Sequence, residues 1–284
     1  MIATAEDHAM LASEFLGLPW QHLALSLVLC LVVSTPGFKR VTYFVSLGYA
    51  ASIAAQAIVM PLLYWNTLRD WALVQSVLLL AYGLRLGTFL ALRERTASYQ
   101  KDQTENAARL ARLRGSIKAA IWVCVSLLFT LMFLPALLTM SAQAEGQALP
   151  STPLGILLMV AGLSVEACAD WQKSRFKKQN PAHFCDVGLY RVVRFPNYFG
   201  EMVFWLGVFI SALSAYQSPA AWGLCGLGFV YLELLMLGAS RSLELKQTGR
   251  YGADAAYQAY AKRTPILFPW LPLYSLQHLK LLIR

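Results

Sequence analysis

The sequence has few charged residues. Asp, Glu, Lys and Arg make up 14% of its 284 residues, against about 25% in soluble globular domains. Hydrophobic residues make up 57%, and the mean hydropathy is +0.50. These values argue against a soluble enzyme and predict a protein that crosses a membrane several times.

Motifs of several function classes are also absent. The five cysteines contain no C-x-x-C pair, so neither a disulfide framework nor a metal site is predicted, and His183 with Cys185 and Asp186 is a minor metal alternative. There is no Walker A motif, and the glycines between 223 and 228 lie inside an apolar run, which excludes a P-loop or Rossmann domain. No nucleophile motif of a Ser-His-Asp hydrolase is visible. We attribute the net charge of +9 to the basic loops that set the orientation of membrane helices, and therefore expect no nucleic-acid partner.

Seven apolar segments approach the length of about 20 residues that spans a bilayer. They run over residues 18–35, 41–65, 71–92, 117–139, 154–170, 198–215 and 221–239. We therefore predict an all-α polytopic membrane protein with seven transmembrane helices within residues 18–239. Residues 240–284 are expected to form a polar tail, and the whole chain, 1–284, a single integral membrane domain.

Basic residues lie almost entirely on one side of this predicted topology. Of the 24 Lys and Arg, 22 lie in the odd-numbered loops or in the tail; the exceptions are Arg69, in an even loop, and Arg85, inside the third segment. Because cytoplasmic loops carry an excess of Lys and Arg, the N-terminus is predicted outside and the C-terminus in the cytoplasm. The short loops and this strong bias fit a bacterial inner membrane.

Polar residues recur at helical spacing in three of the segments. They are Tyr82, Arg85, Phe89 and Arg93 in the third, Glu166, Asp170, Lys173 and Lys177 at the end of the fifth, and Asn197, Glu201 and Trp205 at the start of the sixth. Each group shares one helix face near the cytoplasmic leaflet. Since charge inside a membrane is costly, we predict a pocket open to the cytoplasm; the alternative is a set of ion pairs that only hold the helices together. Glu233 in the last segment is a further buried acid, with either a protonated or a helix-pairing role.

The loop before the sixth segment concentrates groups that suit phosphate. Pro196 favours the first turn of a helix, and a helix N-terminus offers free N–H groups to an anion. Arg191 and Arg194 add charge-assisted donors. The alternative is an ordinary basic loop followed by a membrane span.

The motifs around these residues resemble the steroid 5-alpha-reductase-like family, especially its bacterial members. They are Asp170-Trp-Gln-Lys-Ser-Arg-Phe-Lys, Gly188-Leu-Tyr-Arg-Val-Val-Arg-Phe-Pro-Asn-Tyr-Phe-Gly-Glu201, Tyr82-Gly-Leu-Arg85 and a tail containing Glu244 and Tyr257-x-x-Tyr260. The resemblance covers about residues 82–270. It implies a seven-helix reductase that takes NADPH from the cytoplasm and a lipophilic enone from the bilayer, contacts membrane lipids and acts as a monomer.

Carried over by position, the resemblance also implies the site residues. Tyr82 would donate a hydrogen bond to the substrate carbonyl as hydride reaches the β-carbon, with Glu201 as the second catalytic residue. The cofactor site would be formed by Arg85, Glu166, Asp170, Lys173, Lys177, Arg191, Arg194, Asn197, Tyr198, Glu201, Trp205, Arg241, Glu244 and Tyr257. Residues 240–284 would close this site on the cytoplasmic side.

The sequence departs from the family at three positions, and two other functions remain as alternatives. Phe195 stands where the family has His, Glu166 stands where steroid-reducing members carry a neutral amide, and Gln56 is a weak counterpart of the glutamate that accompanies the tyrosine. The main alternative is an S-adenosylmethionine-dependent membrane methyltransferase of the isoprenylcysteine carboxyl methyltransferase type, which has a similar Arg-x-Pro-x-Tyr-x-Gly segment. The other is a non-enzymatic membrane protein such as a transporter.

Overall fold

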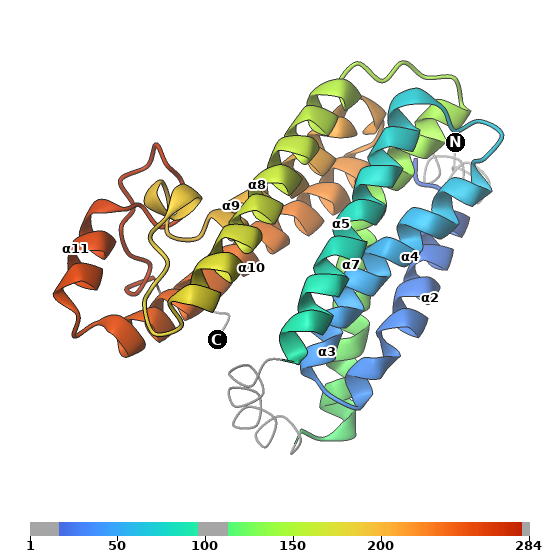
Figure 1. Cartoon of the computed structure of the whole chain (residues 1–284). Coiled ribbons are helices and arrows are strands. Elements are labelled where there is room, and N and C mark those ends of the chain that lie inside the picture. Colours follow the sequence, from blue (N-terminus) through green and yellow to red (C-terminus); the bar gives the residue numbers. More distant parts are fainter. Residues whose placement is uncertain (1–16, 96–112, 280–284) are drawn as a thin grey trace, which may run out of the picture. The chain divides into compact units, whose positions relative to one another are not determined.

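The computed structural model describes residues 17–95 and 113–279 (Figure 1). Regular structure in these residues is helical and includes no strand, which confirms the all-α prediction. In chain order the helices are α2 (Trp20–Ser34), η1 (Thr35–Phe38), α3 (Thr42–Val45), α4 (Leu47–Leu63), α5 (Asp70–Glu94), α7 (Gly115–Ala144), α8 (Thr152–Gln179), η2 (Gly188–Arg191), α9 (Pro196–Ser211), η3 (Leu213–Ala215), α10 (Pro219–Tyr251) and α11 (Ala255–Arg263).

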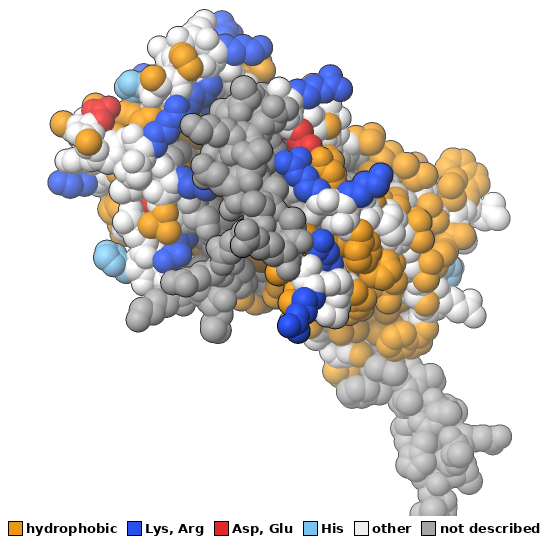
Figure 2. All heavy atoms as spheres, turned by 90° about the horizontal axis from the view of Figure 1, so that it is seen from below, with side chains coloured by type: hydrophobic (Ala, Val, Ile, Leu, Met, Phe, Trp, Pro, Cys, Tyr) orange, Lys and Arg blue, Asp and Glu red, His pale blue; other side chains and the backbone are white. Residues whose placement is uncertain are grey.

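Six helices in the described residues are long and apolar enough to cross a membrane. They are α2 continued by η1, α5, α7, α8, α9 continued by η3, and α10. Helix α4 is apolar but has 17 residues. Large apolar side chains such as Val32, Leu62 and Leu84 are exposed, and Figure 2 shows a broad hydrophobic area on one face. The chain is therefore an integral membrane protein whose apolar exterior faces lipid.

The segment predicted as one helix over residues 41–65 is interrupted, and this prediction is wrong. At Ser46 the backbone leaves the helical region, with φ −115° and ψ −90°, and separates α3 from α4. Directly after the break, Gly48 lies so close to the end of α2 that an added Cβ would be 3.3 Å from the Ser34 Cβ. The break thus accommodates a close contact that hydropathy does not encode.

Two helices continue beyond the predicted apolar spans. The fifth span is predicted to end at about residue 170 and the seventh at about 239, whereas α8 continues to Gln179 and α10 to Tyr251. Hydropathy falls where the chain leaves the apolar layer, but a helix continues until the sequence stops it. Asn180-Pro181 follows α8, and Gly252 follows α10 with its N–H donating to the Thr248 carbonyl, 2.8 Å away. The first part of the expected tail is therefore helical.

The first of two compact units contains residues 1–156 and 208–228. Within it, α2 packs on α4 and α7, and α4 packs on α5. The α4–α5 contact is close at Gly83, where an added Cβ would lie 2.8 Å from the Ala54 nitrogen and 2.9 Å from the Ala50 oxygen. Small residues thus let these helices approach one another, as is common in membranes.

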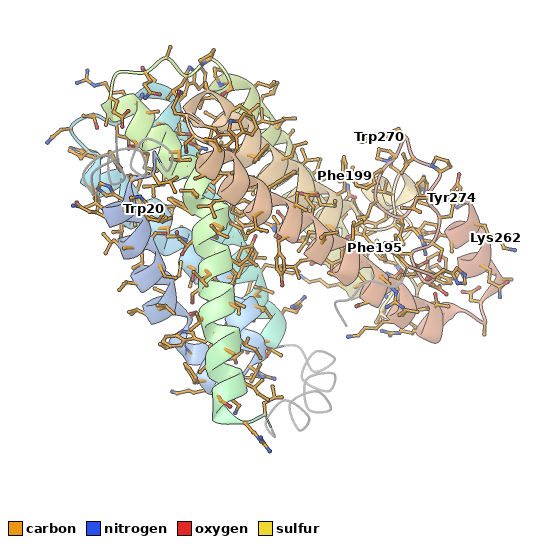
Figure 3. The ribbon with its side chains drawn as sticks, turned by 180° about the vertical axis from the view of Figure 1, so that it is seen from behind. Trp20, Phe195, Phe199, Lys262, Trp270 and Tyr274 are labelled. Atoms are coloured by element: carbon orange, nitrogen blue, oxygen red, sulfur yellow. The ribbon has the colours of Figure 1, made fainter. Side chains whose placement is uncertain are left out.

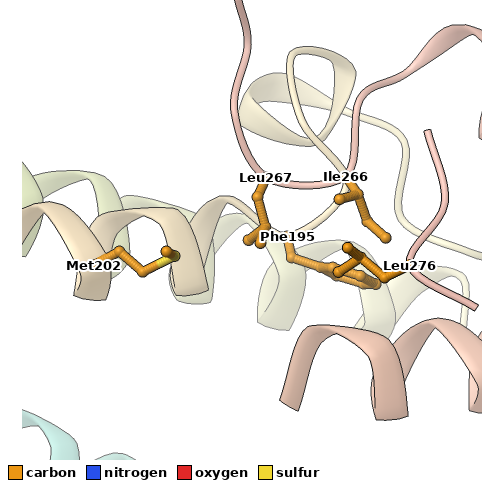
Figure 4. Close-up of a cluster of buried hydrophobic side chains, with 5 residues drawn as sticks. All are labelled: Phe195, Met202, Ile266, Leu267 and Leu276. Atoms are coloured by element: carbon orange, nitrogen blue, oxygen red, sulfur yellow. The ribbon is translucent and has the colours of Figure 1, made fainter. Parts of the chain in front are cut away.

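The second unit contains residues 157–207 and 229–284. It holds most of α8 and α10, the first part of α9, the loop with η2, α11 and the C-terminal segment after α11. A buried cluster of Phe195, Met202, Ile266, Leu267 and Leu276 joins the start of α9 to that segment (Figure 4). The C-terminal segment is thus folded onto α9, while the single membrane domain over 1–284 stays a prediction.

Candidate functional site

Two glycines bring α8 and α9 into backbone contact in the second unit. A Cβ on Gly200 would lie 2.7 Å from both the Glu166 nitrogen and the Gly162 oxygen. A Cβ on Gly162 would in turn clash with backbone atoms of Gly200 and Phe204. Because both positions lack a side chain, the turn of α8 that carries Glu166 lies directly against the first turns of α9.

Carboxyl groups are buried along this contact. Glu166 and Asp170 lie four residues apart on one face of α8, Glu201 follows Gly200 on α9, and all three are buried. Glu233 of α10 lies close enough to Glu201 for the two carboxyl charges to interact. Since ionisable side chains are rare inside membrane helices and are common at functional sites, this concentration of acids marks a candidate site.

The face of α9 that carries Glu201 adds an amide and an indole. Asn197 and Trp205 lie four residues before and after Glu201, and Pro196 provides the first turn of the helix. The Asn197 Oδ1 is buried and has no hydrogen-bond partner in the described structure, and Trp205 is buried. The backbone contact brings the turn of Glu166 next to that of Glu201, and the prediction that Glu166, Asp170, Asn197, Glu201 and Trp205 form one site stays a prediction.

Tyr190, which the sequence did not predict as a site residue, lies close enough to Asp170 to interact with its charge. Its side chain is buried in η2, and its hydroxyl has no hydrogen-bond partner in the described residues. Burial, and next the negative charge of Asp170, raise the pKa of Tyr190 well above its usual value. The group therefore stays a neutral phenol that can donate. The sequence signal for Tyr190 is its place next to Arg191 in the motif Gly188-Leu-Tyr-Arg191.

Arg194 and Glu244 form a buried ion pair. The Arg194 Nη2 lies 2.8 Å from the Glu244 Oε1, and the side chains are 1% and 2% exposed. Arg194 also donates to the Tyr274 carbonyl, and the Glu244 Oε2 accepts from the Leu276 N–H at 2.8 Å. The pair thus fastens the C-terminal segment between α9 and α10. These contacts explain both residues structurally, and their predicted role in cofactor binding stays a prediction.

Lys177 and Tyr257 also have structural partners. The Lys177 Nζ donates to the Tyr251 hydroxyl at 2.9 Å and to the His183 carbonyl, which fixes the loop after α8. Tyr257 is buried on α11, with its ring 5.3 Å from that of Phe184. Lys177 thus links the end of α8 to the end of α10, and Tyr257 packs α11 against the loop that follows α8.

Three further basic residues, with Tyr198, complete the predicted set in this unit. Arg241 is half-buried on α10, and its Nε is buried without a hydrogen-bond partner in the described structure. Arg191 is exposed, and its Nε donates to the Asp186 carbonyl at 3.3 Å. Lys173 is half-buried one turn beyond Asp170. Tyr198 packs against the Phe195 cluster. Arg241 is thus the cation best placed by burial to bind an anionic ligand.

The first unit holds Tyr82 and Arg85. Tyr82 is fully buried on α5, and its hydroxyl lies 2.8 Å from that of Tyr49 on α4. The Tyr49 ring stacks on Phe129 of α7 at 5.3 Å. Arg85 is half-buried one turn further along α5. The tyrosine pair is a neutral hydrogen-bonding group inside the helices, and sequence reasoning missed Tyr49 because the partner lies 33 residues away.

Gln56 has an interhelical role in the first unit. Its Oε1 accepts from the Ser26 hydroxyl, and its Nε2 donates to the Ser52 carbonyl at 3.1 Å and the Phe129 carbonyl at 3.4 Å. These bonds use both the acceptor and the donors of the buried amide. Gln56 therefore links α2, α4 and α7.

One protein family matches most of the chain. Its description is "Protein of unknown function (DUF1295)", and the match covers residues 37–264. The chain belongs to the DUF1295 family. No curated protein and no solved structure matches it.

The DUF1295 match contains the whole predicted site. It begins in η1 and ends directly after α11, so it includes all positions from Tyr82 to Tyr257 and leaves out the C-terminal segment.

Within the described residues of this DUF1295 protein, no group of three His, Cys, Asp or Glu side chains could hold a metal ion. Its five cysteines are free thiols.

Proposed function

We propose that this DUF1295 protein is a membrane-embedded reductase that uses NADPH to reduce the C=C bond of a lipophilic enone. The observation that carries the proposal is the set of side chains on α8 and α9 that consists of the buried Glu166, Asp170, Glu201 and Trp205 and the half-buried Asn197. Buried ionisable groups in membrane helices are costly and mark functional sites. The resemblance of the same segments to the steroid 5-alpha-reductase-like family supports this choice of reaction.

The donor and acceptor set fits NADPH. The nicotinamide carboxamide and the ribose hydroxyls donate hydrogen bonds, which the carboxylates of Glu166 and Glu201 and the partnerless Asn197 Oδ1 would accept. The phosphates need cations, and Arg241, Arg191 and Lys173 would supply them. Trp205 offers an aromatic surface for a ring. Arg194 and Glu244 would act indirectly, because their ion pair holds the C-terminal segment.

The chemistry asked of the chain is electrostatic. When bound, NADPH supplies a hydride to the β-carbon of the enone. Negative charge then grows on the carbonyl oxygen of the substrate, and Tyr82 would donate a hydrogen bond to it. Tyr49, 2.8 Å from the Tyr82 hydroxyl, would fix the direction of that phenol. Apolar surroundings in the membrane keep water away from the reacting groups.

The proposed topology has seven spans, with α4 as the seventh. Its 17 residues reach the lower end of the range that spans a bilayer, about 17–25 residues. The distribution of basic residues favours an orientation with the N-terminus outside and the C-terminus in the cytoplasm. We propose that the membrane is a bacterial inner membrane and that the protein is a monomer. In a variant with Cys124 and Cys168 changed to Ser, an impermeant thiol reagent should label Asn66→Cys in intact cells and leave Lys39→Cys unlabelled. The reverse pattern would invert the topology.

Cofactor binding tests the proposal first. NADPH should raise the unfolding temperature of the purified protein, and the fluorescence of its nicotinamide should change on binding. A panel of enone lipids, steroids and quinones, assayed by NADPH oxidation, would then define the substrate. A protein that binds no NADPH and oxidises none with any of these compounds is not this reductase.

The buried acids also favour a second candidate, the S-adenosylmethionine-dependent methyltransferase. The sulfonium and ammonium groups of that cofactor are cations, which carboxylates such as Glu166, Asp170 and Glu201 would stabilise. NADPH carries phosphates, which the basic residues of the site would bind, and this favours NADPH over S-adenosylmethionine. Thermal stabilisation by S-adenosylmethionine and none by NADPH would select the methyltransferase.

A further inference from the structure

The C-terminal segment, residues 264–279, is fixed to the start of α9. The N–H groups of Arg194 and Phe195 donate to the carbonyls of Pro265 and Ile266 at 2.8 and 3.0 Å, and Ile266 N–H donates to the Leu273 carbonyl at 2.8 Å. The buried cluster of Figure 4 and the ion pair of Arg194 with Glu244 add to these bonds. The side chains that this segment exposes are therefore held at a defined place beside α9.

Phe268 and Trp270 of this segment form an aromatic face with Phe199 of α9, and Leu271 and Tyr274 follow in the same segment. The Phe199 ring lies 5.8 Å from that of Trp270 and 6.2 Å from that of Phe268, and the last two rings are 6.0 Å apart. Trp270 is 70% exposed, and Leu271 and Tyr274 are exposed as well. Figure 3 labels Phe199, Trp270 and Tyr274. An exposed apolar patch on a folded segment marks an interaction surface.

The position of Phe199 identifies what this face contacts. Phe199 lies in the first turn of α9, a membrane-spanning helix, so the rings packed on it lie where that span begins. Trp and Tyr gather at this level of a bilayer, because their rings are apolar and their N–H and O–H groups reach water. Residues 240–279 also carry five basic and two acidic side chains, which suits anionic phospholipid headgroups.

We propose that the aromatic face docks into the phospholipid interface of the leaflet in which α9 begins. The C-terminal segment is then an interfacial membrane anchor rather than a tail in water. This inference does not depend on the reductase proposal, and the segment lies beyond the DUF1295 match, which ends at residue 264. Docking would also help to hold the part of the segment at Tyr274 and Leu276, which Arg194 and Glu244 bind.

Fluorescence quenching tests the proposal on the full chain in phospholipid vesicles. The difference between wild type and Trp270→Phe isolates the emission of Trp270. We expect lipids brominated near the headgroup end of their acyl chains to remove most of this emission, and iodide in the water to remove little. A Trp270→Phe, Lys262→Trp variant moves the indole to α11 (Figure 3), where Lys262 is exposed, and should show the opposite pattern.

Two outcomes would overturn the proposal. Quenching of Trp270 by iodide, as strong as that of the indole at position 262, would place the face in water. Protection from both quenchers would mean that protein covers it. If Trp270→Phe does not fold, Leu271→Asp gives a second test. A charge next to Trp270 should weaken docking and shift Trp emission to the red in vesicles, and unchanged emission would contradict the proposal.

Discussion

The two compact units bury different kinds of polar side chain. Among the described residues, the buried polar groups of the first unit are all neutral: Ser26, Ser34, Ser52, Gln56, Gln75, Ser76, Ser126, Thr130, Thr139, Thr152, Ser211 and Ser218. Those of the second unit include five charged residues: Glu166, Asp170, Arg194, Glu201 and Glu244. The first unit therefore buries hydroxyl and amide groups, whereas the buried charged groups lie in the second unit.

The difference separates packing from chemistry. Several hydroxyls of the first unit donate to a carbonyl of their own helix, as Ser34 does to Cys30, Ser76 to Ala72 and Thr130 to Ser126. Such groups are satisfied locally and cost little in a membrane. Buried charges need partners from other elements. In the second unit, Arg194 pairs with Glu244, and Glu201 has a second carboxyl group, that of Glu233, in its neighbourhood. Such a concentration of buried charge in membrane helices is typical of functional sites.

Breaking the buried ion pair should have the largest effect. Arg194→Met leaves Glu244 as a buried charge without its counter-ion, so we expect a loss of about 3–5 kcal/mol in the free energy of unfolding. Thermal unfolding in detergent, followed by circular dichroism, measures this loss. The double variant Arg194→Met, Glu244→Met should recover part of it, because no unpaired charge then remains.

The matched control is a hydroxyl in the first unit. Ser76→Ala removes a hydrogen bond within α5, and we expect a change of at most about 1 kcal/mol. Equal losses for Ser76→Ala and Arg194→Met would contradict the contrast between the two units.

Removal of the Tyr82 hydroxyl should have the largest effect on turnover. If Tyr82 stabilises charge on the substrate oxygen, Tyr82→Phe should lower kcat about 10²–10³-fold with little change in NADPH affinity. Tyr49→Phe should lower kcat less, because it removes the partner that orients the phenol. Steady-state kinetics with the best enone substrate measures both. An unchanged kcat in Tyr82→Phe would remove this residue from the mechanism.

Neutralising one buried acid should affect binding more than folding. Glu201→Gln keeps the shape of the side chain but replaces a charged acceptor, so the affinity for NADPH should fall about 10–100-fold, the equivalent of about 1.5–3 kcal/mol. Titration of nicotinamide fluorescence measures the affinity. The control Glu145→Gln changes an exposed acid of the first unit and should bind as wild type does. Equal affinity in all three proteins would exclude Glu201 from the cofactor site.

The sequence predicts this molecule best where a single segment decides the outcome. Hydropathy and helical spacing identify the spans and the faces that carry Glu166 with Asp170 and Asn197 with Glu201. The pairing of Arg194 with Glu244 and of Tyr82 with Tyr49 depends on how distant helices pack, and local patterns do not contain it. The sequence predicts Arg194 as a phosphate-binding residue because it cannot reveal this pairing. In the structure Arg194 is buried and binds the C-terminal segment.

The smallest expected effect concerns Tyr260, a neutral buried group in the charge-rich unit. Its hydroxyl donates to the Tyr190 carbonyl at 2.7 Å, and burial raises its pKa above the usual value. Above about pH 10 the unfolded chain loses the tyrosine proton while the folded chain keeps it, so the free energy of unfolding falls as pH rises. Tyr260→Phe should cost about 0.5–1.5 kcal/mol at neutral pH and make this alkaline decline shallower. Unfolding temperatures between pH 8 and 11 measure both effects. As a control, Tyr274→Phe, which changes an exposed tyrosine, should keep the wild-type dependence of stability on pH. The wild-type dependence in Tyr260→Phe would show that folding does not protect this phenol from losing its proton.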